Sequence, residues 1–184
     1  GLRMAAERFR TAMRNAQGDY STDPYNTFDY MMDIAERHNV QGAFYFITGH
    51  SGGAIDGDYT LDMPWMRALM RKIHNRGHEI GLHPSFNTYL DKHQLQREFA
   101  ALLAACEEEG IRQDRCGGRQ HYLRWQAPDT WRHWNDVGLS YDSTVGFADH
   151  VGFRCGPCRE FPVFNLQTRE MLDLIERPLI VMEG

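Results

Sequence analysis

The spacing of apolar residues changes repeatedly along the chain between a helical and a strand-like period. Segments 28–35, 60–76 and 91–109 carry apolar residues every three or four positions, which is typical of amphipathic helices. Segments 42–47 and 78–83 are short apolar runs, as expected of strands buried in a parallel sheet. The clearest helix is 91–109, because one face carries Leu95, Phe99, Leu102, Leu103 and Cys106, and Gly110 follows as a stop signal.

The remaining segments extend this alternation. We predict helices at 1–16 and 127–138, and a helix that begins near Ser21, Thr22 or Asp23 with Pro24 in its first turn. Thr60 or Asp62 is the predicted N-cap of the next helix. Strands are predicted near 119–125, 139–144 and 177–183. Repeated βα units with apolar strands predict an α/β fold with a parallel sheet, either a barrel or an open doubly wound sheet.

Composition is that of a globular domain. The 184 residues are 42% hydrophobic and 24% charged, and we expect a single domain spanning 1–184. A net charge of -5 without a basic stripe argues against a nucleic-acid partner. No apolar run is long enough for a transmembrane segment, and the first 16 residues lack a signal-peptide core, so a cytoplasmic location is the expectation.

Polar side chains with chemical potential follow the predicted strands. His83 ends the strand "HEIGLH", and Asp142 lies in "YDST" at the end of a later strand. Between them, "RQHYLRW" contributes Arg119, His121 and Arg124. Catalytic groups of α/β folds collect at the carboxyl ends of parallel strands, so these residues are candidates for a hydrolytic site. A packed core histidine at His83 and a turn-capping role for Asp142 remain open alternatives.

The stretch "GHEIGLH", with its polar turn and the preceding "GAFYFI", resembles a motif of the polysaccharide deacetylases, the NodB-homology or family 4 carbohydrate esterases. "RQHYLRW", "TW" and "VGLSYDSTVGFADHVGFRCG" further resemble a bacterial branch associated with surface-polysaccharide and O-antigen biosynthesis. The resemblance implies a distorted (β/α) barrel that uses a divalent metal, in most cases zinc, to hydrolyse N- or O-acyl groups on sugars. An acylated polysaccharide or sugar precursor is the partner that it implies.

Residue by residue, the resemblance makes His83 the first metal ligand and places Asn87 at the second ligand position. An amide oxygen is a poor zinc ligand beside imidazole. Arg119 matches the arginine that steadies the catalytic base, with Arg124 as competitor. His121 has no counterpart in the family motif, and a replacement ligand, an acid or an ordinary core histidine are its open alternatives. Asp142 is the expected carboxylate lining the site.

Two parts of the family pattern have no match here. The paired aspartates belong to a strand before segment 28–35, whereas "TFDY" at 27–30 lies inside a helix. The strand with the acid histidine belongs after 177–183. We therefore expect the chain to be a piece of a longer deacetylase-like domain, incomplete at both ends, which alone is inactive if its base and part of its metal site are absent.

Three further interpretations accompany this one. A non-catalytic glycan-binding or scaffold domain with a degenerate metal site is the main alternative, and Asn87 favours it. Cys155 and Cys158 in "CGPC" match the thioredoxin redox motif, but the extended "REFPVFN" that follows lacks the required helix. Trp125, beside a predicted strand end, is a candidate for stacking on a sugar ring.

Overall fold

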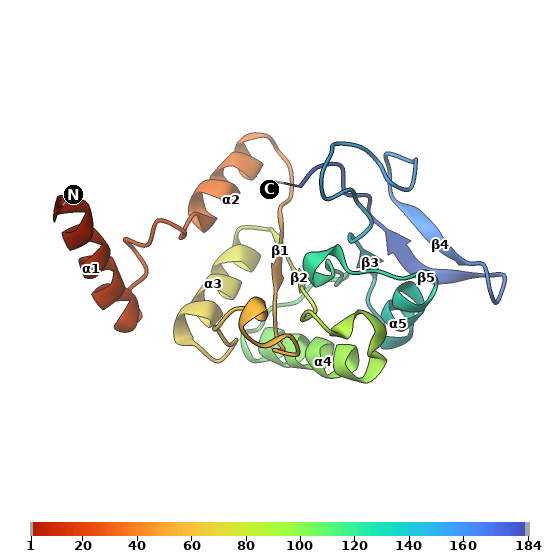
Figure 1. The fold of residues 1–184 in the computed structure, drawn as a ribbon, viewed down its shortest axis with the longest axis horizontal. Helices are drawn as coiled ribbons and strands as arrows, with labels where there is room; N and C mark the ends of the chain where they lie inside the picture. The colour runs from red at the N-terminus through yellow and green to blue at the C-terminus, as the bar shows by residue number, and fades with distance from the viewer. Residues whose placement is uncertain (1, 183–184) are drawn as a thin grey trace.

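The structure is a computed structural model that describes residues 2–182. Its helices and strands are α1 (Leu2–Ala16), α2 (Phe28–Arg37), β1 (Ala43–Phe46), α3 (Pro64–Asn75), β2 (Glu79–Leu82), α4 (Lys92–Glu108), α5 (Asp129–Val137), β3 (Tyr141–Asp142), β4 (Phe161–Asn165) and β5 (Glu170–Glu176). Figure 1 shows α2 to α5 gathered around the strands, with the β4–β5 hairpin at the opposite end from α1. Gly1 and the end of the predicted strand 177–183, at Glu183, lie outside the described residues.

A mixed sheet runs through the centre. β1 pairs in parallel with β2, β3 pairs in parallel with β5, and β4 lies antiparallel on the far side of β5. Parallel bridges from Gly118 to Leu82 and to Asp142 join the two parts. The parallel strands thus follow chain order, without the reversal of a doubly wound sheet. The α/β prediction with parallel strands is confirmed, whereas the sheet of the described residues stays open and a closed barrel is not formed.

Gly118 is needed where the middle segment crosses between β2 and β3. A Cβ atom built on Gly118 would lie 1.8 Å from the carbonyl oxygen of Leu82, far inside van der Waals contact. Only glycine allows the backbones to approach this closely. This close approach puts the segment that follows Gly118, with its arginines and histidine, beside the end of β2.

The apolar faces of the helices pack against the sheet as their spacing predicts. In α4, Leu95, Phe99, Leu102 and Cys106 are buried, while Leu103 is 46% exposed and was wrongly placed on that face. Asp91 caps α4 by accepting the backbone N–H of Gln94, and α4 ends before Gly110, which has a φ of 67°. Other core residues are Met32, Leu69, Met70, Ile73, Ile80, Leu82, Trp134 and Leu174.

The predicted starts of two helices are wrong. α2 begins at Phe28 with Thr27 as N-cap, and Pro24 lies outside it. The Asp23 carboxylate instead accepts the backbone N–H of Tyr25 in a local turn, a side-chain bond that competes with helix formation. α3 starts at Pro64 after Met63, so neither Thr60 nor Asp62 is its cap.

Two predicted strands also differ from the structure. Residues 119–125 form a short 3-10 turn, His121–Leu123 (η3), in which Tyr122 and Leu123 have φ angles of 58° and 50°. Such left-handed backbone cannot continue a strand. The last parallel strand is β5, which ends at Glu176, and residues 177–182 are not a strand. Pro178 explains the boundary, because it has no N–H for the strand ladder.

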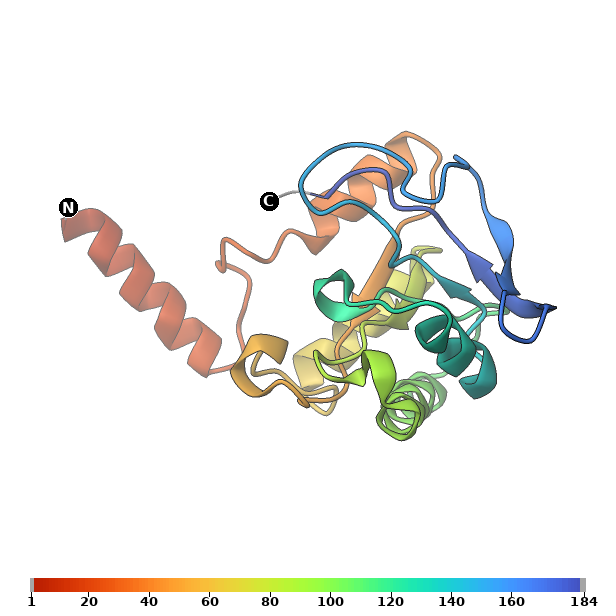
Figure 2. The same ribbon diagram turned by 45° about the vertical axis from the view of Figure 1, so that its right-hand side comes forward.

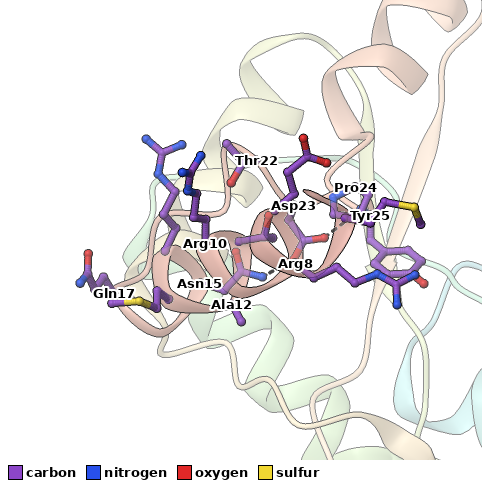
Figure 3. A pocket seen from close by; sticks show the side chains of 14 residues that line it. Arg8, Arg10, Ala12, Asn15, Gln17, Thr22, Asp23, Pro24 and Tyr25 are labelled. Carbon is purple, nitrogen blue, oxygen red and sulfur yellow. Dashed lines mark hydrogen bonds between the residues drawn. The ribbon is translucent and has the colours of Figure 1, made fainter. Parts of the chain in front are cut away.

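Helix α1 stands apart from the body of the molecule in both views (Figures 1 and 2). A cavity of about 1230 Å³ lies between α1 and residues 22–25, lined by side chains that include Arg8, Arg10 and Tyr25 (Figure 3). It is not lined by any of the polar residues predicted at the strand ends. Within residues 2–182, no helix combines the length and apolar character needed to cross a bilayer.

Candidate functional site

Side chains that can do chemistry lie at the ends of three parallel strands of the sheet. His83 directly follows β2, Asp142 ends β3 and Glu176 ends β5. His121 lies beyond the Gly118 bridge, between the first two of these strand ends. Because these strands are parallel, their carboxyl ends share one edge of the sheet. The predicted gathering of His83, His121 and Asp142 at one edge is therefore observed, and Glu176, which the sequence did not indicate, joins them.

His83 and His121 form a hydrogen-bonded imidazole pair. Nε2 of His83 lies 2.9 Å from Nδ1 of His121, and Nε2 of His121 lies 2.9 Å from the carbonyl oxygen of Ile55. A carbonyl oxygen only accepts, so Nε2 of His121 carries a proton. In the neutral pair, Nδ1 of His121 therefore accepts from Nε2–H of His83. Nδ1 of His83 is left unprotonated, and it is buried without a hydrogen-bond partner in the described part of the chain.

The environment of the His83–His121 pair favours charge on one ring over the other. Burial lowers the pKa of His83 to about 4, and the neighbouring His121 contributes to the same decrease. Nε2 of His121 lies 3.8 Å from Oδ1 of Asp56, whose side chain is fully buried. Asp56 accepts the backbone N–H groups of Gly52, at 2.6 Å, and Phe86, at 2.7 Å. Protonation of His83 is therefore unfavourable, and the ring of the pair that faces the buried Asp56 side chain is His121.

Asn87, the predicted second ligand position, is engaged by other groups. Its side-chain oxygen accepts from Nη1 of Arg124 at 3.1 Å, and its amide nitrogen donates to the backbone oxygen of Ser51 at 2.7 Å. Arg124 also donates to the backbone oxygen of Phe86 at 2.6 Å. Arg124 thus fastens the turn after β2, which places a guanidinium cation beside the atom that would bind the metal.

The divalent metal that the resemblance implies does not fit this donor set. The Nε2 atom of His83 faces His121, and the Asn87 oxygen faces a cation, so neither atom points toward a shared position. No group of three His, Cys, Asp or Glu side chains among residues 2–182 is arranged to hold a metal ion. The zinc site therefore stays a prediction.

Asp142 and Glu176 form a buried carboxyl pair. The indole N–H of Trp131 lies 3.1 Å from Oδ2 of Asp142 and 3.1 Å from Oε2 of Glu176. Asp142 also accepts from the backbone N–H of Thr144 at 2.9 Å and from the Thr144 hydroxyl. Burial raises the pKa of both carboxyls, and the charge of Asp142 raises the pKa of Glu176 further. Since Asp142 accepts more donors, we assign the negative charge to Asp142 and the shared proton to Glu176.

Arg119 lies next to this pair without a hydrogen bond to it. Its Nε donates to the backbone oxygen of Ser143 and its Nη2 to the Ser143 hydroxyl, both at 3.0 Å. The guanidinium also lies over the Tyr45 ring, 5.6 Å from the centroid. Its positive charge lowers the pKa of Asp142 in part, against the effect of burial. Arg119 therefore holds the turn after β3 and stabilises the Asp142 carboxylate through space.

Trp125, the candidate for stacking on a sugar ring, packs against another tryptophan. The Trp125 ring meets Trp131 edge-on at 4.7 Å, and its indole nitrogen is buried without a partner among the described residues.

Residues 155–158 form a turn with no helix after Cys155. Burial raises the pKa of Cys155 to about 11. A thioredoxin-type cysteine has the opposite shift.

Comparison with solved structures identifies one fold relative. A crystal structure described as that of a "putative polysaccharide deacetylase" from Mycobacterium smegmatis matches with a TM-score of 0.53 and 19% sequence identity. The match covers 90% of this chain and 50% of that chain. The chain has a polysaccharide deacetylase-like fold. A scan against family models and a search of the curated proteins give no match.

The similarity to this polysaccharide deacetylase-like structure concerns the fold. The resemblance seen in the motifs around His83 and in 119–156 is thus supported by an independent comparison of shape. The chain spans about half the length of the matched structure. Activity, substrate and cofactor do not follow from the fold, and they depend on the residues at the strand ends.

Proposed function

We propose that the protein is a carbohydrate deacylase that hydrolyses N- or O-acyl groups on a bacterial surface glycan or on a precursor of one. The observation that carries the proposal is the His83–His121 pair, which lies at the strand ends of a deacetylase-like fold. Arg119 and the carboxyl pair of Asp142 and Glu176 lie at the same edge of the sheet. The imidazole pair supplies a proton acceptor, Arg119 supplies a cation, and Glu176 supplies a protonated acid at this edge.

The imidazole pair can act as a general base in two linked transfers. Nδ1 of His83 is the nitrogen of the pair without a hydrogen bond, and it is buried, so it accepts a proton from the attacking water when the substrate-bound site admits that water. Nε2–H of His83 then passes its proton to Nδ1 of His121. The product is an imidazolium at His121, stabilised by the Ile55 carbonyl and by the Asp56 carboxylate at 3.8 Å. Water loses its proton as its oxygen bonds to the acyl carbon. General base catalysis of this kind contributes about 10²- to 10⁴-fold to the rate.

Release of acetate tests this proposal directly. The protein is incubated with N-acetylated and O-acetylated oligosaccharides, and free acetate is followed by proton NMR. His83→Ala and His121→Ala should each lower the rate by about 100-fold or more. His93→Ala, an exposed histidine at the start of α4, is the matched control and should leave the rate unchanged. Unchanged acetate release in both pair variants would contradict the proposal.

A second candidate function is a glycan-binding domain without catalysis. The contact between Arg124 and Asn87 favours it, because this contact occupies the second ligand position of the family pattern. The same incubation separates the two functions. A binding domain would bind the oligosaccharides, as seen by NMR, without releasing acetate.

A further inference from the structure

Tyr122 presents an aromatic ring beside the His83–His121 pair. Its ring meets His121 edge-on with centroids 4.6 Å apart, and it meets Phe86 edge-on at 5.4 Å. Even so, the residue is 64% exposed. Tyr122 thus offers a large ring surface to solvent at the edge of the candidate site.

The backbone of Tyr122 is unfavourable for its residue type. Its φ of 58° lies in the left-handed region, which costs a non-glycine residue about 1–2 kcal/mol. Leu123, with a φ of 50°, carries a similar cost. Strained residues of this kind cluster at ligand-binding sites, where the strain holds a side chain in place. Burial does not explain the strained backbone, because Tyr122 is exposed. Neither residue is a glycine, which would adopt this conformation without strain.

Arg124 presents a charged edge close to the same place. Its guanidinium is held between two rings, 4.0 Å from the centroid of Phe86 and 4.1 Å from that of Tyr89. Both of its hydrogen bonds to residues 2–182 use Nη1, to Phe86 and Asn87. Nε and Nη2 make no hydrogen bond within residues 2–182, and neither atom is fully buried. These two nitrogens therefore form an edge that the two rings hold in place, of the kind that binds a carboxylate or phosphate in a bidentate manner.

Phe86 connects the two features, since its ring contacts both Tyr122 and Arg124. We propose that Tyr122 and Arg124 form a binding subsite for an anionic sugar. The pyranose ring stacks on Tyr122. The carboxylate or phosphate of the sugar accepts hydrogen bonds from Nε and Nη2 of Arg124. This inference rests on the proposed function, which makes the ligand a sugar, and it adds that the sugar is anionic.

Binding of three small sugars tests the subsite. Methyl glucuronide carries a carboxylate, glucose 6-phosphate carries a phosphate, and methyl glucoside is neutral. Affinities are measured by calorimetry and by saturation-transfer NMR with the whole chain. A charge-assisted pair should make at least one anionic sugar bind about tenfold more tightly than methyl glucoside. Comparison of the two anions identifies which group the arginine prefers.

Variants separate the two contributions. Arg124→Gln should remove the preference for the anion, and Tyr122→Ala should weaken binding of all three sugars several-fold. Arg124→Lys keeps the positive charge without the bidentate edge, so it should retain only part of the preference. Tyr30→Ala and Arg37→Gln, exposed positions on α2, are the matched controls and should bind as the wild-type chain does.

The comparison of sugars on the wild-type chain keeps the test decisive even if a variant fails to fold. Equal affinity for the neutral and anionic sugars, or no binding of any of them, would overturn the inference. So would a folded Arg124→Gln variant that keeps the preference. Failure of the deacylase proposal is seen separately, as absence of acetate release by a chain that still selects anionic sugars.

Discussion

Asp142 and Glu176 end neighbouring parallel strands with their carboxyl groups buried and bound to one donor, the indole N–H of Trp131. Two buried carboxylates that share one donor repel each other strongly unless one of them holds a proton. The donors from Thr144 stabilise the charge on Asp142, so the proton belongs to Glu176. A pair that shares one proton gives the fold a dependence on pH that can be measured.

Glu176→Gln should remove a loss of stability that accompanies rising pH. The folded chain keeps the Glu176 proton, whereas the unfolded chain releases it above the ordinary glutamic acid pKa of about 4.3. The wild-type free energy of unfolding should therefore fall as the pH rises toward the raised pKa, by at most about 1.4 kcal/mol per pH unit. Glutamine resembles the protonated acid and does not titrate. Urea unfolding between pH 5 and 9 measures both slopes.

Glu170→Gln is the control for this change, because Glu170 is an exposed residue at the start of the same strand. It should leave the pH dependence unaltered. If the Glu176→Gln variant loses stability with rising pH as steeply as the wild-type chain, Glu176 does not hold the proton.

Trp131→Phe should destabilise the fold by removing the donor between the carboxyls. Loss of a hydrogen bond to a buried charged group costs about 1–3 kcal/mol. Trp125→Phe is a well-matched control, because the Trp125 indole nitrogen has no hydrogen-bond partner among the described residues. Urea unfolding at pH 7 should show a larger loss for Trp131→Phe than for Trp125→Phe. Equal losses would mean that the indole N–H of Trp131 contributes nothing beyond ring packing.

The strand-end rule located part of the site from sequence. His83 ends the apolar run 78–83, and His121 and Asp142 lie in the next two segments predicted as strands, so their gathering at one edge was predictable although 119–125 is a turn. The position of Glu176 at a strand end was not predictable in this way. "LIVM" is more apolar than "EMLDLIE", so the last strand was predicted at 177–183, after Glu176. Pro178 was the available signal that the strand ends earlier.

Other contacts depend on residues far apart in the chain. Buried Asp56 accepts the backbone N–H groups of Gly52 and Phe86, and nothing in the sequence of the glycine-rich loop distinguishes Asp56 from Asp58. The helical spacing in α5 predicts that Trp131 is a core residue. Its indole N–H nevertheless binds Glu176, which is 45 positions away. Helical spacing reports which side of a helix is buried, and it does not report which polar atom a buried ring will meet.

Cys155 should react slowly with alkylating reagents. Its pKa is raised to about 11, so less than about 1% of the thiol is ionised at pH 7. Cys158, which is exposed, serves as the internal comparison in the same protein. Iodoacetamide labelling followed by mass spectrometry should modify Cys158 before Cys155. Faster labelling of Cys155 would instead indicate a lowered pKa and revive the thioredoxin-like interpretation.

Zinc binding should improve when the second ligand position is rebuilt. In the chain as it stands, His83 faces His121 and the Asn87 oxygen faces Arg124, so calorimetry with zinc should show only weak binding. Asn87→His combined with Arg124→Ala adds an imidazole and removes the adjacent cation. We expect the zinc affinity to rise at least about tenfold, which corresponds to about 1.4 kcal/mol. Adding His83→Ala to this double variant should abolish the gain. If the unaltered chain binds one zinc ion that His83→Ala removes, the imidazole pair opens to accept a metal, and the metal-dependent reaction implied by the family resemblance becomes the mechanism to test.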